Sequence, residues 1–352
     1  MKKLIFLFVM LVSALSLSSQ TILKADGPGD SYELITSKLA PEGYPLEPPD
    51  CSHPDFGRHI DEIWDSTLNE YVFRFFIHVV PDDDRCLYQD RQRNEIKTYS
   101  ESPDSLKAFQ GETMIFKWSF KLDAGFQSST SFTHIHQLKG VGGDEVKMPL
   151  ITFTPRKGNP DKLQLRYAET TSQITLTAFN IDLLKGNWIS VTESVTFAEE
   201  GQYEVTFVNM VSGDTVFHYK NDDIRMWRTG ASFIRPKWGV YRSLSHPEHL
   251  RDEELLFNDF YIKKVLVAAV SENRAENKIF FYPNPARDFI YLKGTGKNEG
   301  GSLSIMDVNG KTIQKQVIEN PAQVNVSGLK PGIYFVELIS GDKRFFQKLI
   351  KY

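Results

Sequence analysis

Short runs of alternating apolar and polar residues follow one another from residue 70 to about residue 267. In the clearest run, every second residue from Met114 to Leu122 is large and apolar. A period of two is typical of a strand with one buried face. Turn signals separate the runs at intervals of about 8–15 residues, and helical patterns are scarce. The pattern predicts a sandwich or jelly roll of two sheets, with strands at 71–80, 91–97, 114–122, 133–137, 150–154, 162–168, 173–178, 188–197, 203–210, 215–219, 238–243 and 256–265.

The segments that flank this region have other patterns. Residues 20–50 are rich in Pro and Gly and lack periodicity, which predicts an extended lead-in. The stretch Ile60–Trp64 favours one short helix. A polar linker at 268–278 separates the predicted β-domain, residues 51–267, from residues 279–352. The Asn-Gly and Pro-Gly turns of this last segment predict a small antiparallel sandwich.

The first 19 residues have the pattern of a signal peptide. Lys2 and Lys3 precede the apolar run Leu4–Leu17, and small residues follow at Ser18 and Ser19. The run is shorter than the roughly 20 residues that a membrane span needs; a retained N-terminal anchor is the alternative. We therefore expect an exported protein without a transmembrane span.

Composition and net charge indicate which kinds of polymer the protein is able to bind. A hydrophobic content of 41% and a charged content of 24% are those of an ordinary globular protein. The net charge of −4 creates no general field that would attract nucleic acid. Any site for a polyanion must therefore be a local cluster of cations. We expect a monomer that binds no nucleic acid.

Two cysteines are candidates for a disulfide, and a run of aspartates is a candidate metal site. Export permits a disulfide between Cys51 and Cys86, which are the only cysteines. Asp82, Asp83 and Asp84 are candidate ligands for a structural Ca²⁺, although such runs are more often solvated loops. We expect no cofactor to be required for the chemistry considered next.

One predicted strand, 91–97, has a strongly charged face. Unless a bulge shifts the register, alternation places Gln92 on the other side from its charged neighbours, which are Arg91, Arg93, Glu95 and Lys97. Taken alone, such a face is more often an exposed, salt-bridged surface than a site.

Two further strands add histidine, tyrosine and lysine. In one, His134 and His136 share a face, and Gln137 lies opposite unless a bulge shifts the register. In the other, Lys237 and Tyr241 share a face. Each set alone has an ordinary structural explanation. Three such sets in one β-domain indicate a site.

Together these groups fit β-elimination in a uronic-acid polymer. The reaction must neutralise the substrate carboxylate, remove the proton at C5 and protonate the leaving oxygen. We expect Arg93 and His134 to neutralise the carboxylate. The candidate bases are His136 and Tyr241, and we expect His136 to act as the base and Tyr241 as the acid. The expected substrate-binding residues are Arg91, Gln92, Glu95, Lys97, Gln137, Lys237 and Arg242.

The three strands resemble the signature strands of jelly-roll polysaccharide lyases of the alginate lyase type (polysaccharide lyase family 7). That family carries Arg-Thr/Ser-Glu-Leu-Arg, Gln-Ile-His and Tyr-Phe-Lys-Ala-Gly-Val-Tyr, which residues 93–97, 134–136 and 237–241 match in order. The family's Gln is His134 here, and its second Arg is Lys97, which favours the glucuronan lyase or heparin lyase I type. The resemblance implies a concanavalin A-like β-jelly roll and a substrate such as glucuronan, alginate, ulvan or a heparin-like polymer.

The C-terminal segment closely resembles the sorting domain of the Bacteroidetes type IX secretion system. The matching motifs are Tyr-Pro-Asn-Pro at 282–285, Asp-x-x-Gly-Lys at 307–311 and Leu-x-x-Gly-x-Tyr at 329–334. The resemblance implies passage across the outer membrane by the type IX machinery, with the protein released or held at the cell surface. A carbohydrate-binding or spacer module is the alternative.

Two other functions remain open on the same fold. A non-catalytic carbohydrate-binding protein would use Trp188, Trp227 or Trp238 as stacking platforms, although core packing is the commoner role for such residues. A glycoside hydrolase would need two carboxylates about 5–10 Å apart, and its usual Glu-x-Asp-x-Glu strand signature is absent.

Overall fold

The computed structural model describes residues 20–265, 280–293, 301–307, 311–319, 322–340 and 343–352. The chain divides into two compact units, Met1–Val265 and Leu266–Tyr352. The predicted signal peptide and the predicted linker at 268–278 lie outside the described residues. Within the described residues, no helix has the length and apolar character needed to cross a membrane.

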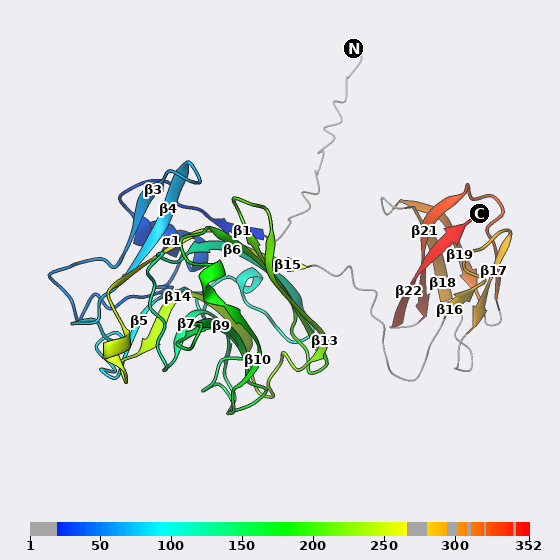
Figure 1. Ribbon diagram of the computed structural model, residues 1–352. Coiled ribbons are helices and arrows are strands. Elements are labelled where there is room, and N and C mark those ends of the chain that lie inside the picture. Colours follow the sequence, from blue (N-terminus) through cyan, green and yellow to red (C-terminus); the bar gives the residue numbers. More distant parts are fainter. Residues whose placement is uncertain (1–19, 266–279, 294–300, 308–310, 320–321, 341–342) are drawn as a thin grey trace, which may run out of the picture. The chain divides into compact units, whose positions relative to one another are not determined.

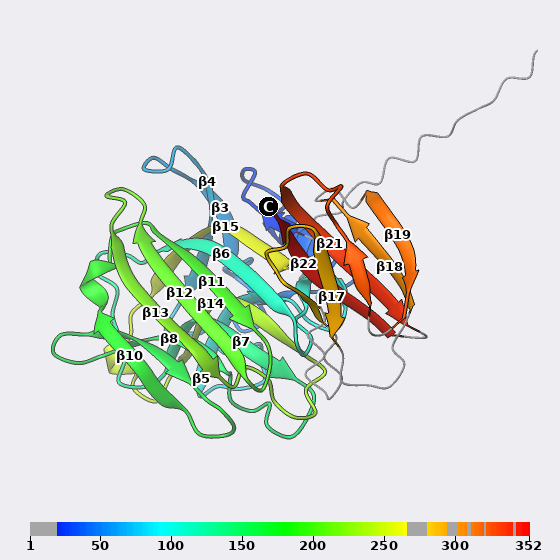
Figure 2. The same ribbon diagram turned by 90° about the vertical axis from the view of Figure 1, so that its right-hand side faces the viewer.

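The first unit is a sandwich of two antiparallel sheets, which confirms the all-β prediction (Figure 1). Sheet A contains, in order across the sheet, β13 (Thr215–Ile224), β12 (Gly201–Asn209), β11 (Ile189–Thr196), β6 (Thr113–Lys121), β15 (Glu253–Val265), β4 (Glu70–Ile77) and β3 (Ile60–Asp65). A further strand, β1 (Gln20–Leu23), pairs with β15. In Figure 2, β13, β12, β11 and β6 lie side by side in this sheet.

Sheet B carries the three strands that the sequence singled out. Its order is β10 (Ile174–Asn180), β9 (Lys162–Tyr167), β8 (Ile151–Arg156), β7 (Thr133–Val141), β14 (Phe233–Ser243), β5 (Arg91–Lys97) and β2 (Leu46–Glu47). The three strands β7, β14 and β5 are therefore adjacent at its centre. Short 3-10 helices lie at Asp104–Leu106, Ile181–Leu183 and Pro247–His249.

The hydrophobic core lies between the two sheets. Trp118 of β6 stacks on His136 of β7, with ring centroids 4.4 Å apart, and the rings of Trp118 and Trp238 lie 6.0 Å apart. Phe153 of β8 meets Phe207 of β12 edge-on at 5.1 Å. Each fully buried phenylalanine of this kind contributes roughly 1.5–3 kcal/mol. Because the inner faces of both sheets are used in this way, the outer face of sheet B is left to carry polar groups.

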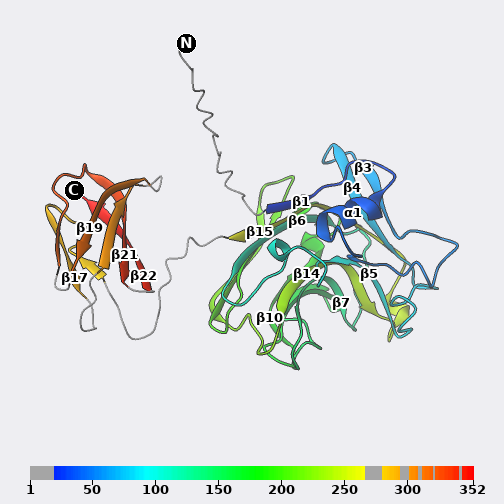
Figure 3. The same cartoon turned by 180° about the vertical axis from the view of Figure 1, so that it is seen from behind.

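The N-terminal segment differs from the predicted extended lead-in. Ser31–Leu39 forms helix α1, which lies beside β1 and β3 (Figure 3). Tyr32, Ile35 and Leu39 are buried at intervals of three and four residues, which is the apolar stripe of an amphipathic helix. The segment is thus part of the folded unit.

The prediction of a short helix at Ile60–Trp64 is wrong, because these residues belong to β3. They pair in register with β4, where Ile60 lies opposite Phe75. Pairing along the sheet satisfies the main-chain hydrogen bonds and buries Ile60, and such tertiary contacts override weak local propensity.

The second unit is a small sandwich, as predicted for the C-terminal segment. One sheet contains β16 (Phe280–Tyr282), β17 (Phe289–Lys293) and β20 (Gln323–Asn325). The other contains β19 (Thr312–Ile318), β18 (Gly301–Met306), β21 (Gly332–Ser340) and β22 (Lys343–Lys351). Its core includes Ile290, Leu303, Val336 and Leu338.

Candidate active site

The outer face of sheet B brings two of the three predicted motif strands together as expected. In the pairing of β14 with β5, Tyr241 lies opposite Arg93 and Lys237 lies opposite Lys97. The intervening Trp238 is buried in the core. The face assignments for β5 and β14 are therefore confirmed. We call the outward-facing polar side chains of β5, β14, β7 and β8 the polar face.

The prediction that His134 and His136 share a face is wrong. Trp238 of β14 pairs with His136 of β7, and Tyr241 pairs with His134. Between these two pairs β14 advances by three residues and β7 by only two, so the register shifts. His136 consequently points into the sandwich and is fully buried. Its Nε2 lies 2.9 Å from Oε2 of the buried Glu193. From this position His136 does not reach the polar face, whereas His134 does.

The same irregularity brings Gln137 to the polar face. Gly239, at the irregularity, has a φ of 132°, and a Cβ there would lie 2.1 Å from the carbonyl oxygen of Asn94. Only glycine fits a left-handed backbone in such close contact. Gln137 pairs with Lys237, and its amide donates a hydrogen bond to Glu95. The alternative register considered for Gln137 is therefore the correct one.

Gln92 and Arg242, both expected to bind substrate, lie on the inner side of sheet B. The Gln92 amide donates to main-chain carbonyl groups between β4 and β5, among them those of His78 and Asp82. Arg242 Nε donates to Gln92 Oε1 at 2.8 Å, and both side chains are almost fully buried. Each follows an outward-facing residue in its strand, so alternation turns it inward. In this structure the pair supports the connection between β4 and β5.

Carboxylates of the protein itself neutralise the cations of the polar face. Lys237 Nζ lies 2.5 Å from Glu47 Oε2 and 2.6 Å from Glu95 Oε2. Lys97 Nζ lies 2.6 Å from Glu47 Oε1. Burial alone would raise the pKa of Glu95, but Lys237 and Arg93 hold it below its usual value. The carboxylates of the cluster are therefore ionised and bound to the lysines, so the lysines are not free to hold a substrate.

Arg93 belongs to this cluster and covers Tyr241. Its Nε and Nη2 donate to both carboxylate oxygens of Asp84, at 2.9 and 3.1 Å. Its guanidinium carbon lies 3.6 Å from the centre of the Tyr241 ring. On the other side, Arg91 Nη1 donates to Tyr241 Oη at 3.1 Å. The two guanidinium groups fix the phenol and place positive charge beside its oxygen.

His134 is the second group on the polar face that can take part in proton transfer. Its ring centroid lies 6.0 Å from that of Tyr241, and its Nδ1 lies 2.8 Å from Thr154 Oγ1. Burial lowers the pKa of His134 to about 3, and nearby Arg156 and Arg166 act in the same direction. The ring is therefore neutral at neutral pH. Among the described residues, Nε2 has no hydrogen-bond partner.

Several residues that complete the polar face were not predicted. Thr152, Thr154 and Arg156 alternate with the buried Phe153, so the period-two pattern at 151–156 could have identified them. Glu47 is different, because it lies in the two-residue strand β2 within a proline-rich segment that carries no comparable signal.

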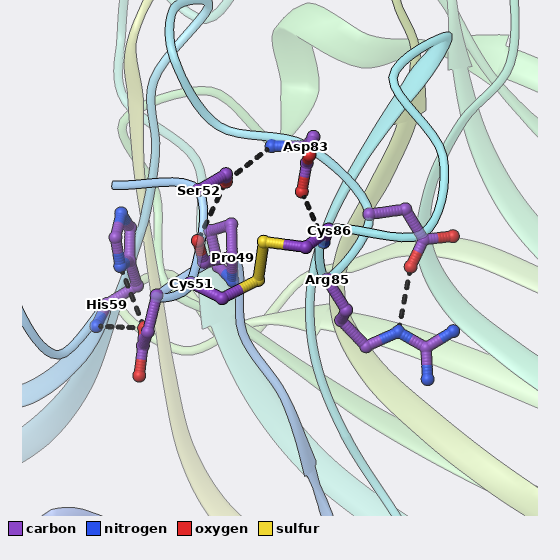
Figure 4. Close-up of a disulfide and its surroundings, with 9 residues drawn as sticks. Pro49, Cys51, Ser52, His59, Asp83, Arg85 and Cys86 are labelled. Carbon is purple, nitrogen blue, oxygen red and sulfur yellow. Dashed lines mark hydrogen bonds and ion pairs between the residues drawn. A yellow bond between two sulfur atoms is a disulfide. The ribbon is translucent and has the colours of Figure 1, made fainter. Parts of the chain in front are cut away.

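The aspartates considered as Ca²⁺ ligands face different partners. Asp82 contacts histidines, and Asp84 binds Arg93. Asp83 Oδ1 accepts a hydrogen bond from the main-chain N–H of Cys86 at 2.7 Å (Figure 4). The three carboxylates are thus already engaged separately. The predicted disulfide between Cys51 and Cys86 is present and closes a loop with a sequence separation of 35.

Comparison with known proteins first identifies the C-terminal unit. Residues 280–352 match the family model described as the secretion system C-terminal sorting domain. The second unit is thus similar to sorting domains of this family. Karilysin of Tannerella forsythia is 29% identical over 101 residues, which are 25% of this chain and 21% of that protein. The chain thus spans about a fifth of the curated relative that it matches.

Solved structures similar to this chain include polysaccharide lyases. An endo-β-1,4-glucuronan lyase from Trichoderma reesei has 15% identity and a TM-score of 0.42, covering 58% of this chain and 86% of its own. An alginate lyase from Pseudomonas aeruginosa has 14% identity and a TM-score of 0.41, covering 62% and 96%. The alginate lyase Aly36B, as a variant with an alginate trisaccharide, has 10% identity and a TM-score of 0.45, covering 71% and 100%.

Proposed function

We propose that the first unit is a polysaccharide lyase that cleaves a uronic-acid polymer by β-elimination. The observation that carries this proposal is the placement of Tyr241 beside a neutral His134. One group can donate a proton and the other can accept one. They share a face on which the guanidinium groups of Arg91, paired with Asp90, and Arg93, paired with Asp84, contact Tyr241. Elimination next to a carboxylate needs these three properties together.

In the proposed reaction, His134 takes the role first expected of His136. The C5–H bond breaks, and its proton passes to His134 Nε2. The electron pair forms the C4=C5 double bond, the C4–O bond breaks, and the leaving oxygen takes the phenolic proton of Tyr241. Afterwards a proton moves from the imidazolium to the phenolate through solvent, which restores both groups. The products are a new hydroxyl end and an unsaturated uronate end.

Arginine would stabilise the substrate carboxylate while charge develops at C5. Arg93 is only 8% exposed and is bound to Asp84 and Glu95, so its charge is already largely paired. Arg91 is more exposed and contacts Tyr241 Oη directly, so it is better placed to touch the substrate. Positive groups that are fixed before the reaction lower its barrier without reorganisation.

The carboxylates on the polar face argue against a glycoside hydrolase. Such an enzyme needs one carboxyl group that stays protonated to serve as the general acid. Burial opposes ionisation of Glu47 and Glu95, but Lys237 and Arg93 hold the pKa of each below its usual value. Both therefore stay ionised and bound to lysine, and neither can act as that acid.

The sorting domain supports export as part of the same proposal. We infer that the N-terminal signal peptide takes the chain across the inner membrane and that the type IX machinery then takes it across the outer membrane. A large anionic polysaccharide outside the cell would be an accessible substrate for a protein delivered in this way.

The test is to incubate the intact purified chain with glucuronan, alginate, ulvan and heparin and to follow ultraviolet absorbance of the conjugated double bond. We expect a rise with one polymer, and loss of that rise in Tyr241→Phe and in His134→Asn. The matched controls are Tyr261→Phe and His218→Asn, both on sheet A and away from the polar face. They should retain the activity.

Three results would contradict the proposal. Binding of a polymer without any double bond would favour the carbohydrate-binding alternative. New reducing ends without a double bond would indicate hydrolysis. Thirdly, His136→Ala should retain activity per folded molecule, because His136 lies in the core; abolition of turnover in the folded variant would restore His136 as the base.

A further inference from the structure

Three histidines and an aspartate converge at a place that the proposed reaction does not use. His53 Nδ1 and His59 Nε2 lie 3.0 and 3.2 Å from Asp82 Oδ1. His78 Nδ1 lies 3.1 Å from Asp82 Oδ2. One ligating atom from each of the four residues lies within 4.8 Å of the other three. The residues come from the segment before β3 and from the connection between β4 and β5, so the fold brings them together.

These N···O separations are hydrogen-bond distances, and they lie close to the separation of two ligands on one metal ion. Two donors bound to a tetrahedral ion at about 2.1 Å are separated by roughly 3.4 Å. The three imidazole rings are also steeply inclined to one another, with interplanar angles of 53°, 84° and 75°. Imidazole with one carboxylate is a ligand set typical of zinc and related divalent transition metals, whereas Ca²⁺ takes oxygen ligands.

The surroundings of His59 also have the form found around a metal ligand. Its Nδ1 faces Asp50 Oδ1 at 2.9 Å and the Gly57 carbonyl oxygen at 3.0 Å, and both are acceptors. Nδ1 therefore donates to these acceptors, and Nε2 is the ring nitrogen that faces Asp82 Oδ1 within the cluster. Asp50 is held in turn by the Tyr32 hydroxyl, at 3.0 and 2.9 Å. A carboxylate on the distal nitrogen commonly orients a histidine that binds metal.

The cluster is half-enclosed rather than sealed. His59 and Asp82 have no exposed side-chain surface, whereas the side chains of His53 and His78 are 22% and 18% exposed. The Phe56 ring packs on His59 and His78, with centroids 4.6 and 4.4 Å away. An ion can therefore reach the cluster from solvent past the partly exposed His53 and His78, beside the Phe56 ring.

We propose that His53, His59, His78 and Asp82 bind one divalent transition-metal ion of the zinc type, which holds the N-terminal segment to the β4–β5 connection. The disulfide links the same two segments nearby, and Figure 4 shows His59 on the Cys51 side of that bridge. Asp84, the partner of Arg93, lies two residues after Asp82. The ion would thus support the connection that fixes the polar face. The role is structural and does not depend on the proposed lyase activity.

The experiment measures metal bound by the intact chain, without a histidine tag. A second group, formed by the exposed His246 and Glu248 and the partly buried His249, could also bind metal. The parent protein is therefore the double variant His246→Ala/His249→Ala. We expect one Zn²⁺ per parent chain after dialysis. We also expect Co²⁺ to give the visible absorption of a tetrahedral site, and Zn²⁺ to displace the Co²⁺.

Ligand variants in this parent decide the assignment. His53→Ala and His78→Ala, the two partly exposed ligands, should lose the stoichiometric ion and the cobalt absorption. Asp50→Asn should retain the site with an affinity about 10–100-fold lower, because only the orientation of His59 is affected. Added Zn²⁺ should raise the melting temperature of the parent and leave that of His53→Ala unchanged.

The proposal is overturned if the parent binds neither ion, or if His53→Ala and His78→Ala bind as well as the parent does. If either variant is unfolded by circular dichroism, the cobalt spectrum of the parent decides: tetrahedral absorption supports the site, and its absence rejects it. Metal content and melting are measured without substrate, so either result stands whatever the outcome of the lyase assay.

Discussion

Acidification should destabilise the first unit through His134 in particular. The pKa of this buried ring falls to about 3 in the folded protein, chiefly because burial disfavours its charged form. In the unfolded chain a histidine titrates near 6.5. Below that pH the unfolded state binds the proton and the folded state does not. The contribution of the neutral ring is therefore complete above the unfolded pKa and is lost as the pH falls toward the folded one.

The size of the effect follows from these two values. At about pH 5 the unfolded ring is almost fully protonated, whereas the folded ring remains neutral. The free energy of unfolding is then lowered by about 2 kcal/mol relative to its value at about pH 7.5. The full effect, reached below the folded pKa, is about 4–5 kcal/mol.

The assay is urea unfolding at these two pH values, followed by tryptophan fluorescence. All five tryptophans of the chain precede residue 266, so the signal reports the first unit alone. His134→Asn should show a smaller loss of stability on acidification than the unaltered protein, by about 2 kcal/mol. The exposed His218→Asn is the control and should keep the original dependence. Other titrating groups are common to both proteins and cancel in the comparison.

The reasoning is refuted if His134→Asn and the unaltered protein lose the same stability between these pH values. That result would mean that the ring takes up a proton as readily in the folded state as in the unfolded one. His134 would then be partly charged near neutral pH, and its assignment as a neutral base would fail together with the stability argument.

Three further substitutions test the supporting structure. Glu95→Gln should lower the free energy of unfolding, measured in urea, by about 3–5 kcal/mol, because it leaves buried cations without a partner. The exposed Glu254→Gln is the control, and an equal effect of both substitutions would contradict the argument. Replacing Cys51 and Cys86 by serine should cost about 3–4 kcal/mol, given the 35-residue separation, and an unchanged urea midpoint would contradict this. Gly239→Ala should lower the free energy of unfolding by about 1–3 kcal/mol and reduce the proposed lyase activity, because the φ of Gly239 is 132° and a Cβ has no room there. An unchanged melting temperature would show that the backbone relaxes at this position.

Period-two alternation predicted most of sheet B and much of the polar face. It placed Arg93 with Lys97 and Lys237 with Tyr241, because β5 and β14 pair without interruption. It failed on His136, since the irregularity lies in the contact between β7 and β14. Such a contact joins residues far apart in the sequence, and no local pattern reports it.

Helix α1 and the histidine cluster could not be predicted from local sequence patterns either. The buried stripe of α1 spans only Tyr32, Ile35 and Leu39, and it lies in a segment dominated by turn residues. His53 and His59 precede a strand, whereas His78 follows another, so their meeting depends on the pairing of β3 with β4. Sequence spacing alone does not associate them.

The carboxylates within the polar face also determine how a polyanion would be drawn to it. Glu47 and Glu95 cancel much of the field of the lysines, so attraction at distances beyond a Debye length of about 8 Å is weak. The remaining long-range attraction comes from arginines toward β8 and β9, such as Arg156 and Arg166. Added salt should therefore reduce the association rate only modestly. Retention of the polymer then depends mainly on short-range contacts made after it has arrived.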